Sequence, residues 1–301
     1  MNSLIRLTGD FQTARGSRPG PATLPAKGTV TAEKISHICK SLETVLSKWP
    51  KDAIIENILI SVEYRQIVAK SNRIREMLNG GKDQEPELSI RGARYLDFNG
   101  SNPRHLMTHY VPEKTIRSTI ERLHECERIV ADHFDGLMNA DKMIDLVKND
   151  MLKQKWNTAI SSTLTRSVFA QLIRDSYYVN EFRIGTPPAA TDENAIVTLF
   201  ETERNPQDLF EELNIDVSAA NILENSVLLT EAEYRTLLER APYLVAMSVI
   251  DLSSYATMND EGSASPAISS LPEYPTDEPI IGVIDTPFEE KYPPYFSNWV
   301  D

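Results

Sequence analysis

Asp285 is the side chain whose surroundings in the sequence best suit catalysis. It follows an apolar run over residues 279–284 and precedes Thr286 and Pro287, which predicts a buried strand ending in a turn. A carboxylate at the tip of such a strand can fix the tautomer of a histidine and stabilise the imidazolium that forms during proton transfer. An aspartate in this position also commonly does no more than close the turn. A catalytic role for Asp285 therefore depends on a partner histidine.

Five histidines are candidates for that partner: His37, His105, His109, His124 and His133. All of them precede Asp285, and none stands in a His-Gly-Thr sequence. A nucleophilic Gly-Thr-Ser segment is missing as well, since Gly185-Thr186 continues with a proline. The chain by itself is therefore predicted to lack a complete catalytic triad and to be inactive alone.

Metal and cofactor sites are not predicted. His105 and His109 are four residues apart, which would let them share a metal ion on a helix, but their segment has the pattern of a strand. On a strand that spacing separates the two side chains by about 13 Å, which is too far for one ion. His124 has no second histidine four residues later, and the sequence has no glycine-rich phosphate loop.

Composition excludes several classes of protein. The two cysteines, Cys39 and Cys126, fall within helical patterns, so we expect buried thiols rather than a disulfide framework or a zinc site. A formal net charge of −13 argues against nucleic acid or an acidic membrane as a partner, because phosphate binding needs clustered lysine and arginine. The N-terminal residues form no apolar leader, and no segment has the roughly 18 consecutive apolar residues of a membrane helix. These features predict a cytoplasmic protein.

Hydrophobic periodicity and the breaks rich in proline and glycine divide the chain into six segments. They are a flexible arm over residues 1–30, a first α+β domain over 31–136, a helical connector over 137–190, a second α+β domain over 191–256, a linker over 257–278 and an extended segment over 279–301.

The first domain is predicted to have helices on one face of an antiparallel sheet, and the second to alternate strands and helices. The first has predicted helices over residues 31–48, 72–78 and 113–134 and predicted strands over 58–64, 90–97 and 105–111. That order matches most of a ferredoxin-like unit. The second has predicted strands over residues 196–200, 226–229 and 244–249 and predicted helices over 206–213 and after Thr230, where Thr230 and Glu233 are spaced as a capping box.

Three features resemble the subtilisin-like serine proteases. Residues 281–286, Ile-Gly-Val-Ile-Asp-Thr, are similar to the strand that carries the triad aspartate in that family. The element order over residues 195–250 resembles the small propeptide domains that fold against such proteases, and residues 295–300 are similar to a segment of a cytoplasmic bacterial branch. The sequence departs from the family at Pro287, where many relatives have glycine.

The resemblance implies an α+β protein with two ferredoxin-like or propeptide-like units joined by helices, followed by the first strand of a catalytic domain over residues 279–301. The leading hypothesis is then a regulatory, inhibitory or targeting N-terminal region of a subtilisin-like peptidase, with Asp285 as the triad aspartate. Its implied partners are the remaining catalytic domain, a peptide or protein substrate and an ATPase. The alternative is a protein-interaction module without catalysis, and a third hypothesis is a hydrolase that uses His105 or His109.

Overall fold

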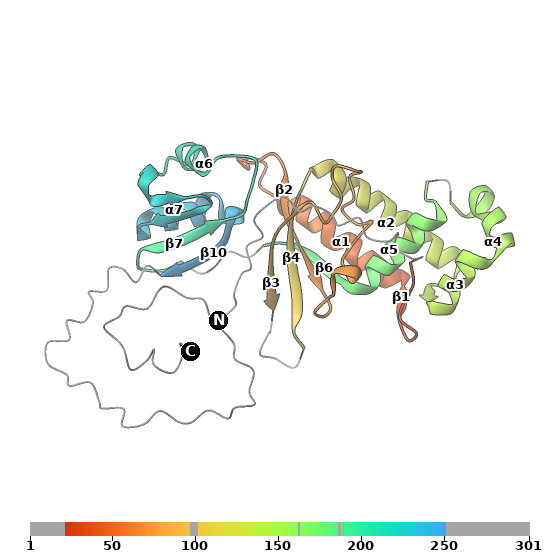
Figure 1. Ribbon diagram of the computed structural model, residues 1–301. Coiled ribbons are helices and arrows are strands. Elements are labelled where there is room, and N and C mark those ends of the chain that lie inside the picture. Colours follow the sequence, from red (N-terminus) through yellow and green to blue (C-terminus); the bar gives the residue numbers. More distant parts are fainter. Residues whose placement is uncertain (1–21, 97–101, 162, 186–187, 189, 251–301) are drawn as a thin grey trace, which may run out of the picture. The chain divides into compact units, whose positions relative to one another are not determined.

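The structure is a computed structural model that describes residues 22–96, 102–161, 163–185, 188 and 190–250. Within those residues the fold is α+β, with seven α-helices, three small antiparallel sheets and no closed barrel (Figure 1). The helices are α1 (Ala32–Lys48), α2 (Glu113–His133), α3 (Ala140–Lys148), α4 (Asp150–Lys155), α5 (Arg166–Tyr178), α6 (Pro206–Glu212) and α7 (Glu231–Arg240). The strands are β1 (Thr29–Thr31), β2 (Ile58–Tyr64), β3 (Ile90–Leu96), β4 (Arg104–Val111), β5 (Leu137–Asn139), β6 (Val179–Ile184), β7 (Ala195–Leu199), β8 (Ile222–Leu223), β9 (Ser226–Leu229) and β10 (Val245–Ile250).

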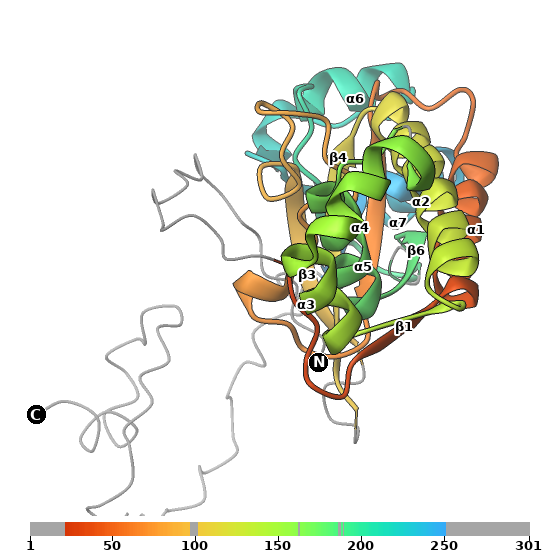
Figure 2. The ribbon, with the colours of Figure 1, turned by 90° about the vertical axis from the view of Figure 1, so that its right-hand side faces the viewer.

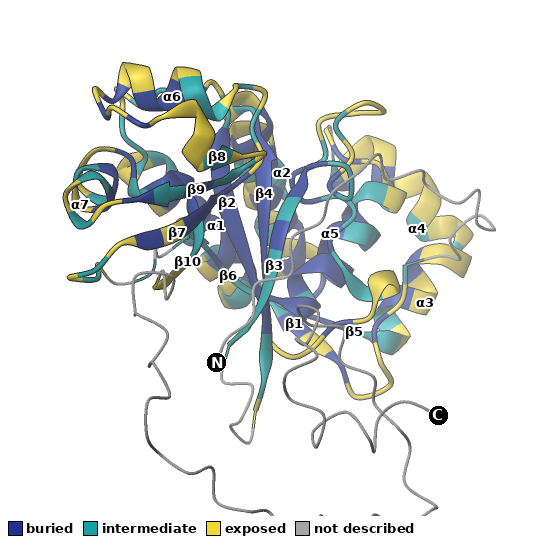
Figure 3. Ribbon diagram, turned by 60° about the vertical axis from the view of Figure 1, so that its left-hand side comes forward, coloured by how far each residue is buried: buried dark blue, intermediate teal, exposed yellow. Residues whose placement is uncertain are grey.

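The first four-stranded sheet has the order β3-β4-β2-β6, and every neighbouring pair is antiparallel. Its central strands β2 and β4 are buried along nearly their whole length (Figure 3). Helices α1, α2 and α5 lie on one face of this sheet (Figures 1 and 2). They form one hydrophobic core with alternate residues of the strands, among them Ile60, Val62 and Met107.

Local sequence explains the two long helices. Thr31 begins α1, because its side chain accepts a hydrogen bond from the Lys34 amide at 3.2 Å. The apolar residues of α1 recur every three or four positions, and those of α2 do the same, so each helix buries one stripe. Burying a large aliphatic side chain in such a stripe contributes about 1.5–3 kcal/mol. Helices α1 and α2 pack against each other side by side (Figure 2).

The second four-stranded sheet has the order β10-β7-β9-β8 and is also antiparallel throughout. Its elements follow the chain as β7, α6, β8, β9, α7 and β10. Helix α7 begins with the predicted capping box: Thr230 and Glu233 each bond the other's backbone. One face of the sheet, with Val197 and Leu229, packs on Phe210 of α6 and on Tyr234 of α7.

The predicted helix over residues 72–78 is wrong. The structure has only a short 3-10 turn at Lys70–Asn72, and Leu78 has a positive φ of 58°. The backbone amides of residues 75–77 bond to the carboxylate of Asp175 instead of to a helical turn of their own. The segment 137–190, expected to be a helical connector, contains α3, α4 and α5 and also supplies β6, which pairs with β2.

Candidate functional site

Asp285 lies outside the described residues, together with the whole linker and C-terminal segment expected over residues 257–301. Its role as a triad aspartate therefore stays a prediction. All five histidines fall within the described residues, and the structure shows what each of the two candidates on β4 can do.

His105 and His109 lie on a strand, as predicted, and both are buried. His105 accepts a hydrogen bond at Nδ1 from the Val68 amide at 3.2 Å. The Nδ1 atom of His109 lies 3.0 Å from the Pro86 carbonyl oxygen and 2.9 Å from the Ser89 hydroxyl. That hydroxyl donates to Pro86 and so does not offer its proton to the imidazole. Both imidazoles are thus buried, and their Nδ1 atoms are engaged by the connection between β2 and β3.

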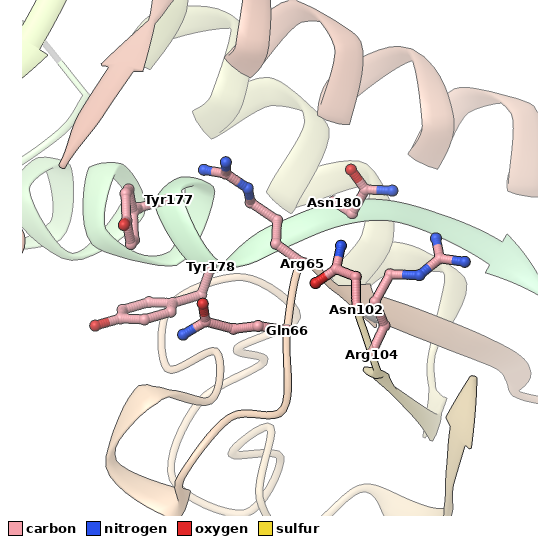
Figure 4. Close-up of a pocket in the computed structure, with 7 residues that line it drawn as sticks. All are labelled: Arg65, Gln66, Asn102, Arg104, Tyr177, Tyr178 and Asn180. Carbon is pink, nitrogen blue, oxygen red and sulfur yellow. The ribbon is translucent and has the colours of Figure 1, made fainter. Parts of the chain in front are cut away.

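A polar pocket of about 520 Å³ lies at one end of the first sheet (Figure 4). Its lining comes from four places: the chain after β2, the start of β4, the end of α5 and the start of β6. The residues are Arg65, Gln66, Asn102, Arg104, Tyr177, Tyr178 and Asn180. The Arg65 guanidinium lies 5.5 Å from the centre of the Tyr177 ring, a cation–π distance.

Glu63 supplies the negative charge behind this pocket. It is 2% exposed and pairs with Arg104 and with Arg183, and its carboxylate accepts a further hydrogen bond from Asn180 at 3.1 Å. Burial lowers the pKa of Lys34, next to Asn180, to about 8. The pocket can hold a polar ligand, but its lining has no nucleophile with a general base beside it. A glutamate inside the apolar β2 pattern was the sequence signal for this site.

The second sheet has an open face, opposite its helices, made by Ile196, Leu223, Leu228, Met247 and Val249. Residues directly opposite each other on neighbouring strands share a face, and the register places Val249 opposite Ile196 and Ile196 opposite Leu228. Met247 and Leu223 belong to the next row, on either side of the Thr198–Ser226 pair. Side-chain exposure reaches 40% for Ile196, 48% for Val249 and 76% for Leu223. This open face is therefore mainly apolar, with the hydrogen-bonded hydroxyl pair of Thr198 and Ser226 between its apolar side chains, and Ile196, Val249 and Leu223 stay exposed among the described residues.

The apolar character of the open face follows from a simple sequence property. In β7 the helix-facing residues Ala195, Val197 and Leu199 are all apolar, and the opposite set, Ile196 and Thr198, begins with a large apolar side chain as well. A run of that kind is typical of a strand that is covered on both sides. The open face is thus a candidate protein-docking surface.

A scan of the chain against protein-family models found no match, and searches of curated proteins and of solved structures found none either. Over the part of the chain that the structure describes, no helix has the length and apolar composition to cross a membrane.

Proposed function

We propose that this chain is the N-terminal regulatory region of a subtilisin-like serine endopeptidase, and that its second sheet docks on the catalytic domain through the open face. The topology of that unit carries the proposal. Its order β7-α6-β8-β9-α7-β10, with β9 inserted between β7 and β8 in the sheet, is that of a ferredoxin-like split βαβ unit. The propeptide domains that residues 195–250 resemble have this kind of fold.

The first sheet supports the further proposal of two ferredoxin-like units. Its four strands have the same order as those of the second sheet. In both sheets the first and third strands along the chain lie in the middle, the fourth lies beside the first, and the second lies beside the third. The crossover from β2 to β3 differs, because it has a 3-10 turn where the second unit has helix α6. The second unit is therefore the closer match to a propeptide domain, and it is the one to which we assign docking.

The open face suits a partner that covers it with apolar groups. Exposed apolar patches of this kind on folded proteins mark interaction surfaces, because covering them removes apolar area from water. A protease domain that receives the sheet of a propeptide would do so. In this proposal Asp285 belongs to that domain as its triad aspartate, and a peptide or protein is its substrate.

The docking test uses the whole chain and the catalytic domain of subtilisin, with a chromogenic peptide as substrate. We expect the chain to slow hydrolysis, and Ile196→Asp to weaken the inhibition by about 10-fold or more, because a new charge would be buried in an apolar contact. Ala232→Asp is the matched control, since it places the same charge on exposed α7. An absence of inhibition, or equal inhibition by Ile196→Asp, would show that the open face does not dock on a subtilisin-like domain.

The catalytic assignment of Asp285 needs its own experiment. When the chain is fused to a segment that carries the histidine and serine motifs of the family, we expect peptide hydrolysis. Asp285→Asn should lower kcat by roughly 10⁴-fold, as loss of the aspartate does in a Ser-His-Asp triad. Unchanged activity would show that Asp285 is not a triad aspartate. The alternative function, an interaction module that uses the open face and has no catalytic role, would then be favoured.

A further inference from the structure

Three side chains of metal-ligand type meet between α1 and α2, away from both sites described above. Cys39 and Glu43 are four residues apart and so share one face of α1, and His124 comes from α2. The Sγ atom of Cys39 lies 3.4 Å from Nε2 of His124, and that same Nε2 lies 3.1 Å from Oε1 of Glu43. All three ligand atoms lie within 4.8 Å of one another.

The spacing of these atoms fits a zinc ion. Bond lengths of about 2.3 Å to sulfur and about 2.0–2.1 Å to nitrogen and oxygen, at tetrahedral angles, put sulfur about 3.6 Å and oxygen about 3.3 Å from nitrogen. The distances in the structure, 3.4 Å and 3.1 Å, are each within a few tenths of an ångström of these values. Small side-chain rotations would open the group enough to accept the ion.

The surroundings of His124 add an independent observation. Its other ring nitrogen, Nδ1, faces Oε2 of Glu127 at 3.7 Å. A histidine that binds zinc through one nitrogen usually offers the other N–H to a carboxylate, which fixes the tautomer and makes the ligand more basic. Glu127 is one turn further along α2 and is placed for that role.

Access to the group is one-sided. Cys39 is fully buried, whereas the side chains of His124 and Glu43 are 54% and 48% exposed. Glu43 also lines a surface groove of about 430 Å³, together with Arg117 and Glu121. An ion could therefore enter from solvent, and its fourth coordination position would face water, as in zinc sites with three protein ligands.

We propose that Cys39, Glu43 and His124 form a binding site for one zinc-type divalent ion, with Glu127 orienting the histidine. A thiolate, an imidazole and a carboxylate together suit zinc better than magnesium or calcium, which prefer oxygen ligands alone. The competing explanation is a Glu43–His124 ion pair that happens to lie beside a buried thiol. The proposal is independent of docking through the open face.

The test uses the whole chain without an affinity tag, reduced and dialysed against Zn²⁺ or Co²⁺. We expect one bound ion per chain by elemental analysis, and a thiolate-to-cobalt charge-transfer absorption with Co²⁺. Cys39→Ser should remove that absorption, and His124→Gln and Glu43→Gln should each lower the affinity for zinc strongly. Glu127→Gln should lower it by about 10–100-fold, the usual effect of removing a partner of a ligand.

Cys126→Ser is the matched control. Like Cys39, Cys126 is a buried thiol, but it lies on α2 and is not part of the group. It should bind zinc and give the cobalt absorption as the unaltered chain does. His124→Gln and Glu43→Gln change half-exposed side chains, so they test the site even if Cys39→Ser does not fold. A chain that retains no ion, or that retains it equally in His124→Gln and Cys39→Ser, would overturn the proposal.

Discussion

His109 is the residue whose protonation should most affect folding. Its imidazole is buried between β4 and the loop before β3, and its Nε2 atom has no hydrogen-bond partner. Burial lowers the pKa of His109 to about 4; the Pro86 carbonyl opposes this shift, whereas Arg73 and Arg91 add to it. The imidazole is therefore neutral in the folded state at neutral pH. Protonating it while it stays buried costs free energy.

The first prediction follows from the sign of that shift. An unfolded histidine has a pKa of about 6.5, so between about pH 6.5 and 4 the unfolded state binds the proton and the folded state does not. The contribution of His109 to the free energy of unfolding should therefore be fully present above about pH 6.5. It should decrease by roughly 2 kcal/mol when the pH is lowered from 7.5 to 5. Urea unfolding over that range measures the slope. His109→Asn should flatten it, and exposed His37→Asn should not; a slope unchanged in His109→Asn would contradict the assignment.

Single residues differ in how far the sequence specified them. The position of His105 and His109 on a strand and the burial of Cys39 and Cys126 were predicted from local periodicity, and the structure confirms both. The approach of Cys39 to His124 could not be predicted. It depends on how two helices distant in sequence are rotated against each other, which the packing of their whole contact decides.

At the scale of elements, Asp175 holds the long connection between β2 and β3 in place. Its Oδ2 atom accepts hydrogen bonds from the amides of Arg75, Glu76 and Met77 at 2.9, 2.8 and 3.1 Å. Its Oδ1 atom accepts from Arg174 Nη1 at 3.1 Å. The carboxylate is fully buried, so no water molecule could take its place as the acceptor for these donors.

The second prediction is that Asp175→Ala destabilises the protein by about 3–5 kcal/mol. The change removes the paired charge of buried Arg174, which keeps only carbonyl acceptors, and it leaves three amides without their acceptor. Urea unfolding gives the free energy, and hydrogen exchange should show faster exchange at residues 75–77. Asp132→Ala is the control: Asp132 pairs with Arg128 on the exposed side of α2, so the change should stay within about 0.5 kcal/mol. A cost for Asp175→Ala as small as that of the control would mean that the connection does not depend on Asp175.

The sequence did not predict β1, which starts within the expected arm, nor β5 and β8, and two further misjudged elements have clear physical reasons. Residues 72–78 have helical spacing, but their amides are used by Asp175, a contact between residues about one hundred positions apart that no local pattern contains. Strand β6 lacks strict alternation: its buried residues Val179 and Phe182 are three apart, a helical spacing, and a register shift interrupts its pairing with β2. The strands with regular alternation or a continuous apolar run, such as β2 and β9, were predicted correctly.

For the described part of the molecule, the α+β class followed from the sequence, but the order of strands within each sheet did not. Pairing such as that of β2 with β6 joins segments far apart in the chain, and one sequence gives no direct signal for it. The structure also shows that the core of the second sheet includes Ile55, Leu59 and Tyr110 from the first domain. The two units share apolar contacts, which the predicted division at residues 137–190 did not anticipate.

Tyr243 is central to those shared contacts. Its hydroxyl accepts a hydrogen bond from the Ile54 amide at 3.1 Å, and its ring lies 4.9 Å from that of Trp49. Arg204 adds a hydrogen bond of 2.7 Å to the Ile54 carbonyl oxygen. These bonds connect the end of α1 and the chain after it to the second sheet, so the two cores should unfold together.

Two substitutions of Tyr243 test how strongly this residue couples the two cores. Tyr243→Phe removes only the hydroxyl and should cost about 1 kcal/mol while unfolding stays a single transition. Tyr243→Ala also removes the ring and should cost about 3–5 kcal/mol, the usual range for losing a buried aromatic side chain. Because the ring belongs to the core of the second sheet, hydrogen exchange should then speed up in β7 and β9 well before it does in β2 and β4. Equal acceleration in all four strands would contradict this prediction. It would mean that the two sheets still unfold as one cooperative unit without the Tyr243 ring.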